Sequence, residues 1–106
     1  MSASDKLYVA RIIKWDGMTL VNICDKELLG TTVKGMGLEM HISHEYFDGE
    51  LVNTNQALNL VRSSNIVNLV GERIVSKVLE AKLASERAVK KVGKVSFLMI
   101  FKFTCR

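Results

Sequence analysis

The sequence predicts an α+β domain of two layers, in which two helices pack on one face of a small antiparallel or mixed sheet. Three observations predict this class. Strand patterns dominate the first half of the chain, helical patterns follow from residue 53, and a strong strand pattern closes the chain. Strands and helices that occur in separate runs are typical of α+β proteins. With 106 residues, the chain is expected to form one domain, 1–106.

The first half predicts a hairpin and further short strands. Residues 7–14 and 18–24 are rich in β-branched and aromatic side chains, and Asp16-Gly17 between them is the strongest short hairpin signal. Residues 25–30 resemble one turn of helix. Residues 38–43 alternate with a period of two, which predicts a half-buried strand whose core side consists of Leu38, Met40 and Ile42.

The second half predicts two helices and a final strand. Residues 44–50 are polar and aromatic, and we expect a loop that runs into a short strand at 51–52. Two residues that favour helix starts, Asn53 and Thr54, begin a helix of about two turns. A longer helix is predicted for 65–83. In the final strand we expect one fully apolar side to face the core: Val95, Phe97, Met99, Phe101 and Phe103.

The predicted long helix carries a glycine and a polar stripe. Asn65, Asn68, Glu72 and Ser76 fall within a narrow arc at 100° per residue. One interpretation is a ligand or RNA contact. The interpretation that we favour is structural, with the asparagines capping helix ends and Glu72 accepting bonds from a nearby loop. Because glycine destabilises a helix interior, we expect Gly71 to touch the backbone of a strand or of the preceding helix.

The net charge of +4 is unevenly distributed. Residues 87–106 hold six basic side chains and no acidic one. We predict that these six bind RNA: Arg87, Lys90, Lys91, Lys94, Lys102 and Arg106. No aromatic ladder is visible, so we expect shape and phosphate contacts on structured RNA, with no specificity for DNA.

Other chemistries have weaker signals. His41, His44 and Glu45 form an H-x-x-H-E string, but a closed zinc site needs about four ligands, so no metal is predicted. Cys24 is followed by Asp25, which raises a thiol pKa and reduces its reactivity. No nucleotide-binding glycine motif occurs, and no cofactor is predicted. We expect no catalytic residues.

The same composition indicates a cytoplasmic protein. The longest apolar run, residues 97–101, is too short to span a bilayer, and no secretory signal is visible at the N-terminus. The two cysteines, Cys24 and Cys105, are expected to be reduced and partly buried. No membrane contact is expected.

Three segments resemble a known family. "CDKELLG" at 24–30, "HEYFDGELV" at 44–52 and "NIVNLVGERIV" at 65–75 are similar to the archaeal proteins grouped as domain of unknown function 424. The resemblance implies a small archaeal α+β domain without an established enzyme activity. Many members finish with a glycine-rich turn followed by Val-Pro-His. This chain ends differently, so a ligand role for that histidine does not apply.

These observations together predict a non-catalytic, RNA-associated protein of the archaeal translation apparatus. The most concrete version is a small ribosomal or ribosome-associated component that contacts ribosomal RNA and neighbouring ribosomal proteins. One alternative is a small enzyme or ligand-binding domain with a site near residues 24–30, 44–50 and Glu72. A second is a protein–protein adaptor that uses the acidic loop 45–50.

Overall fold

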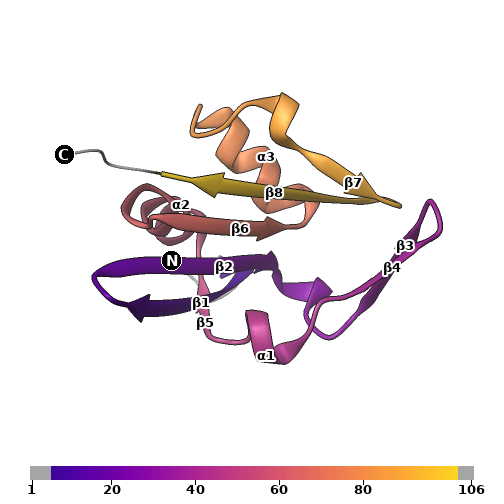
Figure 1. Cartoon of the computed structure of the whole chain (residues 1–106), viewed down its shortest axis with the longest axis horizontal. Coiled ribbons are helices and arrows are strands. Elements are labelled where there is room, and N and C mark those ends of the chain that lie inside the picture. The colour runs from indigo at the N-terminus through magenta and orange to yellow at the C-terminus, as the bar shows by residue number, and fades with distance from the viewer. Residues whose placement is uncertain (1–5, 103–106) are drawn as a thin grey trace.

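A six-stranded mixed sheet forms the centre of the protein (Figure 1). The computed structural model describes residues 6–102. The sheet strands are β1 (Tyr8–Trp15), β2 (Met18–Asp25), β5 (Glu50–Val52), β6 (Ile66–Val70), β7 (Lys90–Val92) and β8 (Val95–Phe101). Their order is β5-β1-β2-β6-β8-β7; β2 and β6 are parallel, and every other pair is antiparallel. The predicted α+β class is confirmed.

The hairpin of β1 and β2 forms where the sequence predicts it. Asp16 has φ 49° and Gly17 has φ 78°. A two-residue hairpin turn with positive φ at both positions matches the right-handed twist of its strands. The pair extends from Tyr8 opposite Asp25 to Trp15 opposite Met18.

The predicted helix over 65–83 is wrong, because this segment is a strand followed by a helix. Residues 66–70 form β6, buried between β2 and β8, and α3 (Glu72–Glu80) begins after Gly71. The β-branched side chains of β6 favour a strand. Gly71 has φ 126° at the start of α3, and a Cβ there would lie 2.4 Å from Cγ of Asp25. The glycine thus makes room for a carboxylate. The expected contact with a strand backbone is present, because the N–H of Gly71 donates to the carbonyl oxygen of Ser96 in β8 at 2.8 Å, but Gly71 precedes the helix and does not lie within it.

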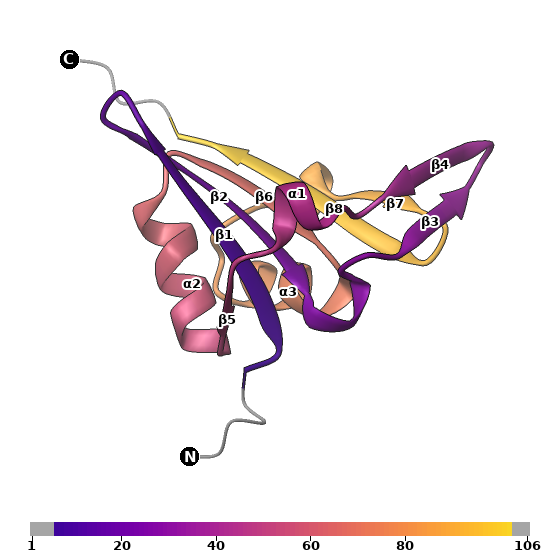
Figure 2. The ribbon, with the colours of Figure 1, turned by 90° about the horizontal axis from the view of Figure 1, so that it is seen from below.

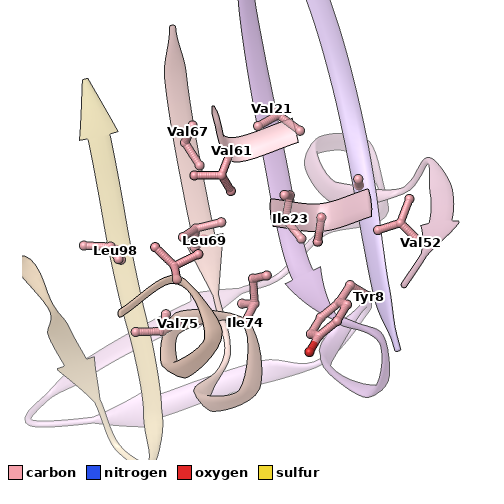
Figure 3. Packing of buried hydrophobic residues seen from close by; sticks show 13 residues of the cluster. Tyr8, Val21, Ile23, Val52, Val61, Val67, Leu69, Ile74, Val75 and Leu98 are labelled. Carbon is pink, nitrogen blue, oxygen red and sulfur yellow. The ribbon is translucent and has the colours of Figure 1, made fainter. Parts of the chain in front are cut away.

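Two helices and the sheet enclose the main core. α2 (Thr54–Ser63) starts at Asn53, whose side chain accepts the N–H of Gln56 in a capping box. Buried side chains of α2 and α3 meet those of four central strands (Figure 3). They include Val61, Ile74, Val75, Val21, Ile23, Val67, Leu69 and Leu98. Among residues 6–102, no helix is long and apolar enough to cross a bilayer.

The opposite side of the sheet is only partly covered. The hairpin of β3 (Thr32–Gly35) and β4 (Leu38–His41) and the short helix α1 (His44–Phe47) lie on the side away from α2 (Figure 2). With Val9, Cys24 and Val70 they form a second, smaller core. The segment 44–50 therefore is not simply the predicted loop. Ser43 caps α1 by accepting the N–H of Tyr46.

Two predicted apolar sides face a core only in part. In β4, Leu38 is 58% exposed and Met40 is 43% exposed, although Ile42 beyond the strand is buried. In β8, Ser96 and Leu98 are the buried residues. On the predicted core side, Val95 and Phe97 pack against the second core, whereas Met99 and Phe101 are half open. The prediction was wrong for Met99 and Phe101, because α3 covers the other side of β8, which carries the less apolar set of residues. Phe103 lies outside the described residues.

Candidate functional site

The uncovered part of the sheet forms an apolar surface built from four adjacent strands. The register aligns Ile13 with Leu20, Leu20 with Ile66, and Ile66 with Phe101. Side chains of one row point to the same side of a sheet. We call this surface, which α2 and α3 leave uncovered, the open face; its residues are Ile13, Trp15, Met18, Leu20, Ile66, Met99 and Phe101. Trp15 is 69% exposed and Met99 is 55% exposed. Exposed apolar side chains that are contiguous, unlike single ones, mark interaction surfaces.

A cavity of about 390 Å³ continues the open face toward α1 and β4. Its floor is formed by β2, β6 and β8, and its walls by β4, α1 and β7. We call it the α1–β4 cavity. The side chains that bound it are mostly apolar, and Met40, Tyr46 and Met99 at its edge are exposed. A concave apolar site with few polar groups is typical of ligand binding.

Two asparagines form the polar part of the cavity floor. Asn22 on β2 lies directly opposite Asn68 on β6. Nδ2 of Asn22 donates to the carbonyl oxygen of Tyr46 at 2.9 Å, and Nδ2 of Asn68 donates to Oδ1 of Asn22 at 2.8 Å. A carbonyl only accepts, so the Tyr46 carbonyl fixes the orientation of both amides. Within residues 6–102, Oδ1 of Asn68 has no hydrogen-bond donor.

The described residues around this cavity supply basic groups and no carboxylate. Among the described residues that line it, none carries a carboxylate, and the basic side chains are Lys90 and His41. Lys90 lies opposite Phe97 in β8 and is exposed. Nδ1 of His41 lies 3.1 Å from Oγ1 of Thr32. An anionic group at the edge of the cavity would therefore meet a cation without a nearby competing carboxylate.

The six predicted RNA-binding side chains do not share one surface. Neighbours on a strand point to opposite faces. Lys90 thus faces the α1–β4 cavity, while Lys91 faces the helix side, where its Nζ lies 3.7 Å from Oε1 of Glu72. Lys94, in the turn between β7 and β8, borders a groove beside α3.

The remaining three basic residues lie elsewhere. Nζ of Lys102 donates to the carbonyl oxygens of Val61 and Arg62, the latter at 2.9 Å, and so satisfies the end of α2. Burial lowers the pKa of Lys102. Arg87 is exposed in the single turn η3 (Glu86–Ala88). Arg106 lies outside the described residues. The structure therefore brings no more than Lys90, Lys91 and Lys94 to one end of the sheet.

The alternative site near 24–30, 44–50 and Glu72 is not assembled as one site. α1 lies on the cavity side of the sheet, whereas Glu72 begins α3 on the other side. Glu72 accepts a hydrogen bond from Oγ of Ser96 and pairs with Lys91. Among the acidic residues of the segment 45–50, Asp48 lies 3.6 Å from Nδ1 of His44.

The segment at 25–27 instead anchors α3. The buried carboxylate of Asp25 accepts the backbone N–H groups of Arg73 and Ile74, each at 2.9 Å. Burial raises the pKa of Asp25, and these two hydrogen bonds oppose the increase. Arg73 forms a bidentate pair with Glu27 at 2.7 and 2.8 Å, which lowers the pKa of Glu27. The positive end of α3 is thus filled by the protein's own carboxylate.

The polar stripe is divided between a strand and a helix, and part of it serves the fold. Oδ1 of Asn65 accepts the N–H of Thr19, which joins the starts of β2 and β6. Asn68 lies in the α1–β4 cavity, and Ser76 is exposed on α3. Asn65 thus serves the fold, although it joins two strands and does not cap a helix as predicted, whereas Asn68 lines the cavity.

The remaining reactive groups have structural surroundings. Cys24 is a free, buried thiol, and burial together with Asp25 raises its pKa to about 12. Such a thiol is a poor nucleophile. Across residues 6–102, no three His, Cys, Asp or Glu side chains are grouped in a way that could hold a metal ion. Cys105 lies outside this range.

Sequence reasoning missed the open face and the asparagine pair. Trp15, Tyr46 and Met99 are far apart in the chain, and only the sheet register and α1 bring them to one side. One signal was present. Asn22 interrupts the apolar run of residues 20–24, and a polar side chain in a buried strand requires a partner.

Comparison with known proteins places the fold in a family. The model of the family described as "Protein of unknown function (DUF424)" matches residues 13–103. A crystal structure of an uncharacterized conserved protein from Methanopyrus kandleri is similar to this chain with a TM-score of 0.74 and 23% sequence identity. The similarity covers 93% of this chain and 96% of the other, and it shows a shared fold. No curated protein matches the sequence.

Proposed function

The chain belongs to the DUF424 family of proteins of unknown function, and we propose that it is a non-catalytic protein that binds structured RNA through its open face. The observation that carries the proposal is the combination of exposed aromatic and methionine side chains with a cavity edged by lysine. Aromatic rings on a sheet offer stacking surfaces to unpaired bases. The flanking lysines offer contacts to phosphate.

The distribution of charge also favours an anionic partner. The chain has a net charge of +4, and Lys90, Lys91 and Lys94 lie at the β7 end of the sheet. The pair of Lys91 with Glu72 is exposed on both sides, at 61% and 55%. An exposed ion pair of this kind contributes little free energy, so Lys91 can exchange it for a phosphate. Lys102 is excluded from the contact surface because it holds the end of α2.

Ribosomal RNA is the most concrete partner that we propose. The small size, the positive charge and the archaeal family are all compatible with a ribosome-associated component that also touches neighbouring ribosomal proteins. Co-sedimentation of the native protein with ribosomal subunits tests this version directly. The proposal expects sedimentation with one subunit that is lost at high salt.

The salt dependence of binding tests the phosphate contacts. Each contact to RNA lowers log K by about 0.7–0.9 per unit of log salt concentration. Three contacts predict a slope of roughly −2 on a structured ribosomal RNA fragment. Replacing Lys90, Lys91 and Lys94 by Gln should remove most of that slope.

A matched variant separates a local contact from a net-charge effect. Lys6, Arg62 and Lys82 are exposed and lie away from the β7 end of the sheet. Replacing these three by Gln removes the same charge and should change the slope by much less. Equal slopes for both triple variants would mean that only net charge matters, and the proposal would fail.

A protein partner is the second candidate. The observation that favours it is the row of Ile13, Leu20 and Ile66, which is apolar without interspersed charge, as at the centre of protein interfaces. This candidate predicts that the chain sediments with ribosomal subunits but does not bind the isolated RNA. Binding to isolated ribosomal RNA with the expected slope would favour the first proposal.

A further inference from the structure

Three features of the α1–β4 cavity do not contribute to the stability of the fold. It has an exposed apolar edge, it has no carboxylate among its described lining residues, and its floor presents an amide that is only partly satisfied. The grooves beside α3 differ in their charge, because Glu72 borders both of them and other acidic residues line them. The cavity is therefore the best candidate for a ligand-binding site.

The hydrogen-bonding capacity of Asn68 defines what that ligand must offer. Its Nδ2 has two hydrogens, of which one is donated to Oδ1 of Asn22. The second N–H and the oxygen Oδ1 remain, so Asn68 presents one donor beside one acceptor. Asn22 cannot rotate away, because its own Nδ2 is held by the carbonyl of Tyr46 at 2.9 Å. The pair of amides is thus preset in one orientation before any ligand arrives.

A flat ring suits the remainder of the cavity. Phe97 and Met99 on β8 and Tyr46 on α1 line it, and the ring of Tyr46 is exposed. A volume of about 390 Å³ is within the range of small-molecule sites. Lys90 at the edge supplies a positive charge outside the apolar interior. The order from floor to edge is thus amide, apolar surface and cation.

We propose that the α1–β4 cavity binds one unpaired purine base of RNA, adenine in preference, with its phosphate near Lys90. The N6 amino group and N7 of adenine are a donor and an acceptor side by side, which is the bidentate partner of an asparagine amide. The corresponding edge of guanine presents two acceptors, O6 and N7, and would leave Oδ1 of Asn68 facing an acceptor. This inference rests on the proposed RNA function and adds base recognition to it.

The inference revises the expected mode of binding. Phosphate contacts alone carry no sequence information. A base held by Asn68 would add a preference that is independent of salt, because it does not depend on released counterions. Base preference and salt slope can therefore be measured separately, and they report on different residues.

The test compares short oligoadenylate with oligouridylate of equal length at one salt concentration, using the full chain. We expect the parent protein to bind oligoadenylate about tenfold more tightly. Asn68→Leu should bring the two affinities together while the salt slope stays the same. Asn55→Leu makes the same change on the exposed surface of α2 and should keep the preference.

A second variant leaves the amide of Asn68 unchanged. Met99→Glu places a carboxylate at the exposed edge of the cavity, beside Asn68 in the register. Because this position is 55% exposed, the variant should fold like the parent and should weaken oligoadenylate binding. Equal binding of both oligonucleotides by the parent, or an unchanged preference in Asn68→Leu, would overturn the inference.

Adenosine monophosphate separates the two proposals. If RNA binds with the expected slope but without base preference, the cavity inference fails and the proposed function stands. If no RNA binds but adenosine monophosphate shifts the side-chain amide resonance of Asn68, the proposed function fails, and of the cavity inference only the recognition of adenine stands, with a free nucleotide in place of RNA. If neither occurs, both fail.

Discussion

Replacing Asp25 by alanine should destabilise the fold by about 2 kcal/mol. The variant leaves the backbone N–H groups of Arg73 and Ile74 without their acceptor at the start of α3. A missing partner for a buried N–H costs about 1–3 kcal/mol. Because Asp25 borders a groove that water can enter, we take the lower value for each group. The loss of a helix N-cap side chain, about 0.5–2 kcal/mol, gives a similar figure.

Thermal unfolding measures this change. With an unfolding entropy of roughly 2 cal/mol/K per residue, a loss of about 2 kcal/mol lowers Tm by about 9 °C for a chain of this size. Ser76→Ala on the exposed side of α3 is the matched control and should leave Tm within about 2 °C of the parent value. A Tm of Asp25→Ala equal to that of the control would show that the carboxylate does not anchor α3.

The pH dependence gives an independent check. Burial raises the pKa of Asp25 above its ordinary value of 3.8, so the native state binds this proton more tightly than the unfolded state does. The contribution of this carboxyl to stability is full below 3.8 and declines as the pH rises through the raised native value. The difference in unfolding free energy between parent and Asp25→Ala should therefore be larger at pH 3.5 than at pH 7. A difference that grows toward pH 7 would contradict the direction of the shift.

Three further predictions concern single residues. Gly71→Ala should lower Tm by several degrees, because a Cβ would overlap the held carboxylate of Asp25 and φ is 126°; an unchanged melt would contradict this. In a Cys105→Ser background, Cys24, with a pKa of about 12, should resist a thiol reagent at pH 8 until the protein unfolds; rapid reaction of the native protein would refute its burial. Lys102→Met should lower stability by about 1 kcal/mol without changing RNA affinity. A loss of RNA affinity with unchanged stability would show that Lys102 contacts RNA.

The local signals of the sequence predicted the hairpin and α2 well. Asp16-Gly17 determines a turn by its own backbone preferences, and Asn53 caps a helix with a side chain three residues from its partner. Both the turn and the helix cap depend only on residues a few positions apart. The segment 65–83 failed because a short buried strand and an amphipathic helix are adjacent there. Their apolar residues together imitate one long helical stripe, and the break at Gly71 reflects a contact with Asp25, far away in the chain.

Local sequence signals could not predict the candidate site. Whether Met99 or Leu98 faces the core depends on which side of the sheet α3 covers, and both sides of β8 are apolar enough to be buried. Asn22 and Asn68 meet because β2 and β6 pair in parallel, a long-range contact that no periodicity reveals. The charge count of residues 87–106 includes Lys90, which lines the cavity, but alternation on β7 directs Lys91 to the other side.

The central claim is that RNA binds to the open face, and resonance mapping tests it most directly. An isotope-labelled protein titrated with a structured ribosomal RNA fragment reports on the indole N–H of Trp15, the side-chain amides of Asn22 and Asn68, and the backbone of every element. We predict shifts at these three side chains, along β6 and β8 and at the Lys91–Glu72 pair, with α2 and the remainder of α3 unchanged. Shifts confined to the helices at concentrations where RNA is bound would contradict it.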